Sequence, residues 1–272
     1  MGIVLAITNQ KGGVGKTTTS INLAASLAAT NRKVLLIDLD PQGNATTGSG
    51  IDKSDLEYSV YDVLVDGITV SESISEAAAA GYDLLAANVD LTGAEMEMID
   101  LSRREYRLRD ALKPIKDRYD YIIMDCPPSL SLLTINGLVA ADAAIIPMQC
   151  EYFALEGLTA LMTTIERISG NLNPELEIEG IVRTMYDPRN SLTRDVSGQL
   201  IEHFGDKVYR TLIPRNVRLA EAPSFGLPIL YYDKQSRGAK AYLALAGEIN
   251  RRYESKDLVK RQLENDSKGV EQ

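Results

Sequence analysis

The segment Gln10-Lys11-Gly12-Gly13-Val14-Gly15-Lys16-Thr17-Thr18 decides the fold. An apolar, β-branched run at 3–8 precedes it and predicts a strand, and the apolar spacing at 20–27 predicts a helix after it. Glycines let backbone N–H groups approach a ligand closely, and a helix N-terminus carries partial positive charge. A strand, a glycine loop and a helix in this order therefore predict a cradle for phosphate groups.

The loop also carries side chains that suit a nucleoside triphosphate. Lys16 can reach the β- and γ-phosphates, and the Thr17 hydroxyl can ligate Mg²⁺. The alternative, a glycine-rich turn with solvent-facing lysines, leaves the flanking strand and helix unexplained. We therefore predict that the nucleotide is bound by Lys11, Gly12, Gly13, Val14, Gly15, Lys16, Thr17 and Thr18.

Length and composition predict one large α/β domain. The chain has 272 residues, of which 44% are hydrophobic and 25% charged, and no linker rich in Pro, Gly or Ser divides it. We expect a single-domain P-loop NTPase with a mostly parallel twisted sheet covered by helices on both faces. The domain is expected to span 1–253, followed by a solvated C-terminal tail at 254–272.

Cysteine content and hydropathy point to the cytoplasm. Cys126 and Cys150 are too few and too far apart for a disulfide framework or a C-x-x-C metal site. The first residues form a core strand rather than a signal peptide, and the apolar runs are shorter than a membrane span.

The net charge of −9 by itself disfavours nucleic-acid binding. The charge is unevenly distributed, however, because residues 183–260 hold 14 Lys and Arg against 9 Asp and Glu. The remainder of the chain therefore carries −14. An acidic body with a basic C-terminal third is expected.

Two further buried runs end in aspartate, one at Asp38 and Asp40 and one at Asp125. In an open parallel sheet, ligand chemistry collects beyond the carboxyl ends of the strands, so these carboxylates should face the phosphates. We predict that Asp38 lies in the outer shell of the Mg²⁺ ion, that Asp125 holds the metal through water, and that Asp40 positions the attacking water. The alternative for Asp40 is that it caps the turn at Pro41.

The rest of the chain predicts further elements. Helices are expected at 60–64, 91–101, 103–117, 154–172, 193–204 and 238–253, and strands at 82–87, 143–149, 178–185 and 208–213.

One departure from the general P-loop pattern is informative. Position 10 is Gln rather than Gly, and an extra lysine, Lys11, directly precedes the glycines. This K-G-G-x-G-K-T form resembles the deviant Walker A motif of the ParA/MinD group, in which the first lysine reaches the partner's phosphates across a nucleotide-sandwich dimer. The segments 38–44 and 213–229 resemble the switch I element and the I-P-R-N-V-R-L run of the small, Soj-type ParA partitioning ATPases. The resemblance covers roughly 1–253.

This resemblance implies an ATP- and Mg²⁺-dependent homodimer with Lys11, Lys16 and Asp40 as catalytic residues. It places Pro214 and Asn216 against the adenine base. It also puts Glu151 near the dimer face, where that side chain either binds nucleotide or partner or only stabilises a helix N-terminus.

The same resemblance implies DNA binding through Arg189 and Arg218. Since no helix-turn-helix precedes the loop, binding is expected to go to the phosphates of double-stranded DNA without reading sequence, and to weaken with salt. We further expect slow ATP hydrolysis that a ParB-like centromere-binding partner stimulates, and a cytoplasmic, nucleoid-associated location.

Three other functions are known for P-loop proteins of this kind. A MinD-like membrane-cycling ATPase would end in an amphipathic helix, but the tail is diluted by acids and lacks Phe and Trp, so no membrane partner is expected. A reductase like the nitrogenase iron protein would need cluster cysteines, yet Glu97 and Leu132 lie near where they would fall. A metabolic enzyme that phosphorylates or ligates a small molecule is the third.

Overall fold

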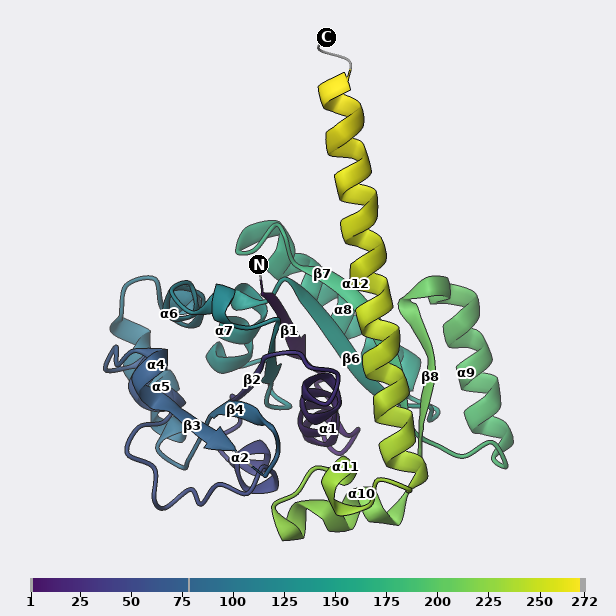
Figure 1. Ribbon diagram of the computed structural model, residues 1–272, viewed down its shortest axis with the longest axis horizontal. Helices are drawn as coiled ribbons and strands as arrows, with labels where there is room; N and C mark the ends of the chain where they lie inside the picture. The colour runs from purple at the N-terminus through teal and green to yellow at the C-terminus, as the bar shows by residue number, and fades with distance from the viewer. Residues whose placement is uncertain (1, 78, 270–272) are drawn as a thin grey trace.

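Strand β1 (Ile3–Ile7), which leads into the glycine loop, lies inside an eight-stranded sheet. A computed structural model describes residues 2–77 and 79–269, with side chains described through 256 and at 258. The strand order is β3-β4-β2-β5-β1-β6-β7-β8, and every neighbouring pair is parallel except β3 and β4. The predicted mostly parallel sheet is confirmed (Figure 1).

The sheet is covered on both faces, which explains the apolar runs of its inner strands. Strands β2 and β5 are buried at every position, as expected where helices pack on both sides. The strands after β1 are β2 (Val34–Asp38), β3 (Ile74–Ala77), β4 (Tyr82–Leu85), β5 (Tyr121–Asp125), β6 (Ala143–Gln149), β7 (Glu177–Tyr186) and β8 (Val208–Pro214).

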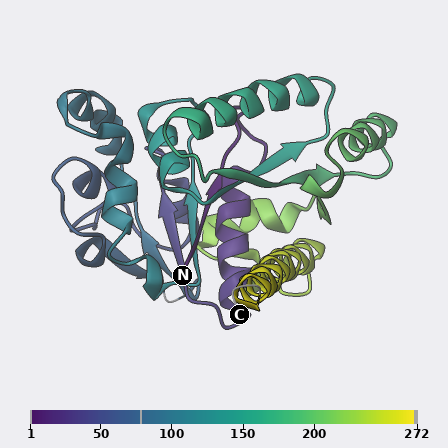
Figure 2. The same cartoon turned by 90° about the horizontal axis from the view of Figure 1, so that it is seen from above.

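Two hydrophobic cores, one on each face, join the helices to the sheet. One core is formed with α1 (Lys16–Ala28), α2 (Asn44–Gly48), α10 (Val217–Glu221), η5 (Ala222–Phe225), α11 (Ile229–Tyr232) and α12 (Arg237–Gly269). The other is formed with α3 (Val60–Leu64), α4 (Val70–Ser73), α5 (Leu91–Glu97), η1 (Met98–Asp100), α6 (Arg107–Leu112), α7 (Leu132–Ala140), α8 (Ala154–Asn171) and α9 (Ser191–Phe204). Figure 2 shows α8 and α12 on opposite sides of the sheet.

The helix expected at 103–117 is interrupted. Only α6 is α-helical there, between the short 3₁₀ turns η2 (Arg104–Tyr106) and η3 (Lys116–Arg118). Arg103 has φ 56°, in the left-handed region, so it cannot continue a helix. Pro114 lacks the backbone N–H that a helix interior requires.

The last helix is longer than predicted. It was expected to end at 253, but α12 runs to Gly269, and no Pro or Gly lies between 248 and 268 to stop it. Figure 1 shows its C-terminal half projecting away from the sheet. The predicted tail at 254–272 is thus helical through Gly269, and its last three residues lie outside the described residues.

Strand β3 was not predicted. It is an antiparallel strand of four residues at the sheet edge, paired with β4 from Ile74 to Ala77. So short a segment shows no clear alternation of apolar and polar residues.

Close packing between β7 and β8 gives a test of the fold. A Cβ at Gly180 would lie 2.6 Å from Cε2 of Tyr209 and 2.8 Å from the Lys207 carbonyl oxygen. We expect Gly180→Ala to lower the free energy of unfolding by about 1–3 kcal/mol, measured by urea denaturation. Gly198→Ala is the matched control, because a Cβ there meets nothing within 4 Å on the exposed side of α9. Equal effects of the two changes would contradict the packing described here.

Candidate functional site

The glycine loop joins the end of β1 to the start of α1 at Lys16. Gly13 and Gly15 have φ values of 74° and 88°, a left-handed conformation that is strained for other residues. A Cβ at Gly12 or Gly13 would meet nothing within 4 Å, so the loop surface is open to a ligand. The predicted strand, loop and helix are confirmed, and the first N–H groups of α1 are available to an anion.

Lys16 lies beneath this loop. Its side chain is buried, and Nζ donates a hydrogen bond to the Lys11 carbonyl oxygen at 3.3 Å. Burial lowers the pKa of Lys16, while the negative charges of Asp125 and Asp40 oppose that shift. A bound phosphate would supply the negative charge that this desolvated ammonium group favours.

Asp38 and Asp125 lie side by side because β2 and β5 pair in register at these residues. Both are buried, and burial, together with their mutual repulsion at Asp125, raises the pKa of each carboxyl group. Oδ1 of Asp125 accepts a hydrogen bond from Ser20 Oγ at 2.8 Å, and the Thr17 side chain lies close enough to lower the pKa of this carboxyl group.

The second oxygen of Asp125, Oδ2, is buried without a hydrogen-bond partner among the described residues. An unpartnered carboxylate oxygen beside a threonine hydroxyl suits Mg²⁺, which binds oxygen ligands and keeps several of its waters. The donor set of Asp125 and Thr17 therefore fits the predicted metal. The metal-binding roles of these two residues stay predictions.

Asp38 has a role that its position in the sequence did not suggest. Oδ2 accepts hydrogen bonds from the backbone N and Oγ1 of Thr46, both at 2.8 Å, and Oδ1 accepts from Asp40 N at 3.1 Å. The carboxylate thereby fixes the turn that follows β2. Its predicted place in the outer metal shell stays a prediction.

Asp40 is half-buried, and its charge acts on Lys16. Oδ1 also accepts a hydrogen bond from Gln42 N at 2.9 Å, which is the turn-capping contact that the sequence left open. Both interpretations of Asp40 are compatible with this geometry, since a capped carboxylate retains a second oxygen for water.

A hollow of about 160 Å³ beside the loop is suited to a nucleotide base. Pro214 and Asn216 line it together with Gly15 and Thr18, so the structure brings the predicted base contacts to the glycine loop. Asn216 Oδ1 is engaged by Arg218 N at 2.8 Å as the cap of α10. The Asn216 amide group therefore has both hydrogens of Nδ2 and one remaining lone pair of Oδ1 to offer a base.

Thr184 and Met185 are among the residues of this hollow that were not predicted. Thr184 Oγ1 donates to the Val14 carbonyl oxygen at 2.7 Å and ties the end of β7 to the glycine loop. Met185 has φ 49°, which is uncommon for a residue other than glycine. No local pattern marks either residue, because both contacts depend on the pairing of distant strands.

The Lys11 side chain contacts Glu151, unlike Lys16, which contacts the glycine loop. Its Nζ lies 2.6 Å from Glu151 Oε2, and both side chains are about half exposed. The next residues, Tyr152 and Phe153, expose 74% and 71% of their surface and pack edge to face. Lys11 is thus on the surface of the nucleotide-binding edge, beside an exposed aromatic pair, rather than under its own loop.

Arg189 and Arg218, the predicted DNA contacts, follow the carboxyl ends of the neighbouring strands β7 and β8. They therefore lie at the same edge of the sheet as the glycine loop. Arg215 N donates to the Tyr186 carbonyl oxygen at 3.3 Å and links the two loops that carry them.

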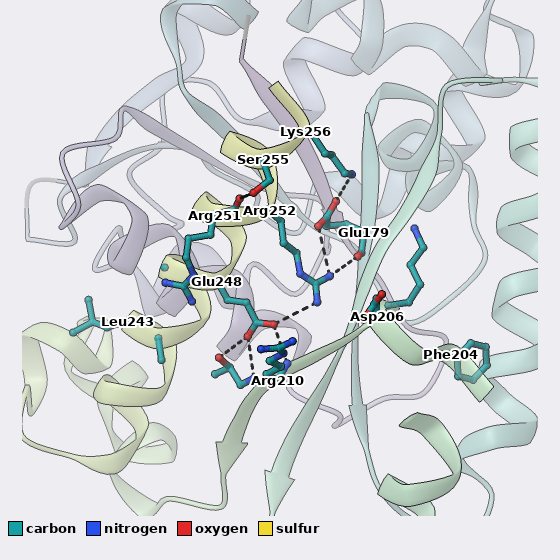
Figure 3. Close-up of a pocket in the computed structure, with 14 residues that line it drawn as sticks. Glu179, Phe204, Asp206, Arg210, Leu243, Glu248, Arg251, Arg252, Ser255 and Lys256 are labelled. Atoms are coloured by element: carbon teal, nitrogen blue, oxygen red, sulfur yellow. Dashed lines mark hydrogen bonds and ion pairs between the residues drawn. The ribbon is translucent and has the colours of Figure 1, made fainter. Parts of the chain in front are cut away.

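A larger hollow, of about 1110 Å³, lies elsewhere, between α12, β8 and the 3₁₀ turn η4 (Gly205–Lys207). Figure 3 shows its polar network. Glu248 accepts hydrogen bonds from the backbone N of Arg210 and of Thr211, at 2.9 and 3.0 Å. Arg252 lies 3.3 Å from Glu248. These contacts occupy backbone N–H groups of the edge strand β8. None of the predicted site residues lines this hollow.

Comparison with known proteins identifies the family of this chain. The family model for an AAA domain matches residues 2–178. The chromosome partitioning protein ParA of Caulobacter vibrioides is 56% identical over 248 residues, covering 90% of this chain and 93% of that protein. The sporulation initiation inhibitor protein Soj of Bacillus subtilis is 55% identical over 249 residues, covering 92% and 98%.

A solved structure adds support for the nucleotide site. Cobyrinic acid a,c-diamide synthase from Mycobacterium smegmatis, with bound ADP and magnesium, has a TM-score of 0.83 and 38% identity and covers 94% of this chain and 97% of that one. The two curated relatives are more similar in sequence than this structure and match nearly full length. The chain therefore belongs to the ParA/Soj family of P-loop ATPases.

Proposed function

We propose that this protein hydrolyses ATP and uses the ATP-bound homodimer to hold nonspecific DNA during chromosome or plasmid partitioning. The observation that carries the proposal is the pair of lysines on one loop. Lys16 is buried beneath its own glycines, whereas Lys11 is on the surface and bonded to Glu151. By exchanging Glu151 for a phosphate, a surface lysine placed in this way can reach the nucleotide of a second subunit.

In this proposal the loop N–H groups and Lys16 bind the triphosphate, and Pro214 and Asn216 contact the base. Thr17 and, through water, Asp125 would hold Mg²⁺, with Asp38 behind them, and the ion would offset charge on the phosphates. Asp40 orients the attacking water. Lys16 in one subunit and Lys11 from the other offset the charge that develops in the transition state.

Dimerisation gives the nucleotide control over DNA. One subunit offers few phosphate contacts, and joining two copies of Arg189 and Arg218 raises avidity without new contacts. Slow turnover, stimulated by a ParB-like centromere-binding partner, then releases the DNA. The protein would accordingly occupy the nucleoid in the cytoplasm.

A membrane-cycling function is the second candidate from the sequence, and sedimentation with anionic liposomes tests it. Within residues 2–77 and 79–269, no helix combines the length and the apolar character needed to cross a bilayer. A ligase-type function is tested by ATP consumption that depends on a small substrate. Liposome binding that depends on ATP would overturn the DNA-based proposal.

The two lysines form a matched pair for mutation. We expect Lys16→Ala to weaken ATP binding by about 3 kcal/mol, since it removes a buried charge contact. Lys11→Ala should leave ATP binding by the monomer near wild type and abolish ATP-dependent dimerisation. Calorimetry and analytical ultracentrifugation measure the two properties. Equal loss of ATP binding in both variants would place Lys11 in its own site.

Two substitutions at Asp40 separate catalysis from turn capping. Asp40→Ala should lower ATP turnover by about a hundredfold or more, as expected for loss of a group that positions water, and trap a dimer on DNA. Asp40→Asn keeps an acceptor for Gln42 N, so it preserves the turn. Wild-type turnover in the Asp40→Asn variant would show that the residue acts only as a cap.

DNA binding is tested by gel shift with ATP, ADP and no nucleotide. Wild-type protein should retard DNA of any sequence with ATP only, and less strongly as salt rises. Arg218→Ala should keep ATP turnover and lose DNA binding, whereas Arg103→Ala, on the distant α6 side, should keep both. Wild-type retardation by the Arg218 variant would show that the DNA surface lies elsewhere.

A further inference from the structure

We propose that Asp187 and Glu221 compete with DNA phosphates for Arg189 and Arg218, and so hold the DNA affinity of one subunit below what its cations alone would give. This inference rests on the proposed DNA binding. It assigns a role to two acidic residues that the proposed nucleotide site does not use.

The first pair lies in the turn after β7. Arg189 Nε donates to Asp187 Oδ1 at 2.9 Å, and Nη2 donates to Oδ2 at 2.7 Å. This is the two-pronged geometry with which an arginine also binds a phosphate group. The guanidinium group, although 88% exposed, is thus already occupied by a carboxylate of the same turn. Arg189 and Arg215 lower the pKa of Asp187 to about 2, so the carboxylate is charged at neutral pH.

The second pair lies on α10. Arg218 Nη1 donates to Glu221 Oε2 at 2.8 Å, and Arg218 Nε lies 3.8 Å from Asp233 Oδ2. Glu221 is held in place, because the Tyr232 hydroxyl donates to the same oxygen at 3.2 Å. The two predicted DNA contacts, Arg189 and Arg218, are therefore each paired with a carboxylate close to them in the sequence.

A DNA phosphate can break these ion pairs, but their carboxylates still lower the affinity for DNA. An exposed ion pair contributes only about 0–1 kcal/mol, so a phosphate can displace the carboxylate. The displaced carboxylate remains nearby and repels the phosphate. Each contact with DNA is then weakened, and stable attachment needs several contacts at once. A dimer supplies twice as many, so the acidic residues sharpen the dependence of DNA binding on dimerisation.

Asp187→Asn and Glu221→Gln test this inference with little change in shape. The amide groups that these substitutions introduce would still accept the hydrogen bonds from Arg189 N and from the Tyr232 hydroxyl. We expect each change to tighten DNA binding about two- to fivefold per subunit, and the double variant to bind DNA with ADP. Fluorescence anisotropy with a random duplex measures affinity, and ATP turnover without DNA should stay at the wild-type rate.

Asp110→Asn is the control for net charge, because Asp110 is also exposed and bound by both prongs of an arginine, Arg103, on the distant α6 side. It changes the formal charge by the same amount as Asp187→Asn. We expect it to leave DNA affinity unchanged within about twofold. Adding Arg189→Ala to Asp187→Asn should remove the gain, since the gain acts through that arginine.

The outcomes separate the inference from the function on which it rests. If wild-type protein binds DNA with ATP but Asp187→Asn and Glu221→Gln bind no tighter than Asp110→Asn, the inference is wrong and the proposed function stands. If neither wild-type protein nor the variants bind DNA with ATP, both are wrong. A gain that persists without Arg189 would also overturn the role given to Asp187.

Discussion

Buried charge at the carboxyl edge of the sheet is the constraint on which the site depends. Lys16, Asp38 and Asp125 lie within one small region from which water is largely excluded. Desolvation penalises each charged form, and the protein compensates only in part, through Ser20, Thr46 and the loop carbonyl oxygen of Lys11. A bound phosphate chain would place negative charge beside Lys16, and its divalent cation would place positive charge beside Asp38 and Asp125. The polypeptide therefore folds into one half of an electrostatic arrangement that the ligand completes.

The sequence predicted most of the fold and the core of the site because both depend on local patterns. Each of these patterns lies within a short stretch of consecutive residues: the glycine loop, the aspartates at strand ends and the apolar periodicities of the helices. Asp125 meets Asp38 simply because parallel strands end at one edge. The left-handed conformation of Arg103 and the strand β3 escaped prediction, since one is a single backbone angle and the other has only four residues.

The contacts that the sequence could not predict are of two kinds. Some connect distant strands, and others pair a charged side chain that looks unpaired in the sequence. The hydrogen bond from Thr184 to Val14 spans 170 residues and depends on the crossover that places β7 two strands from β1. Lys11, Arg189 and Arg218 look like free cations in the sequence, yet each lies within 3 Å of a carboxylate oxygen in the folded chain. Charge counts alone therefore overstate how strongly one subunit attracts phosphate.

The cap that Glu248 places on the backbone of β8 has a consequence beyond this one chain. An outermost strand with free N–H groups can recruit a strand from another molecule, which leads to open-ended association. Proteins that bind densely along DNA meet other copies of themselves at high local concentration. At such concentrations, an exposed edge strand would pair with the same strand of another copy and start a fibre. Occupying these donors from a helix of the same molecule favours reversible gathering over aggregation.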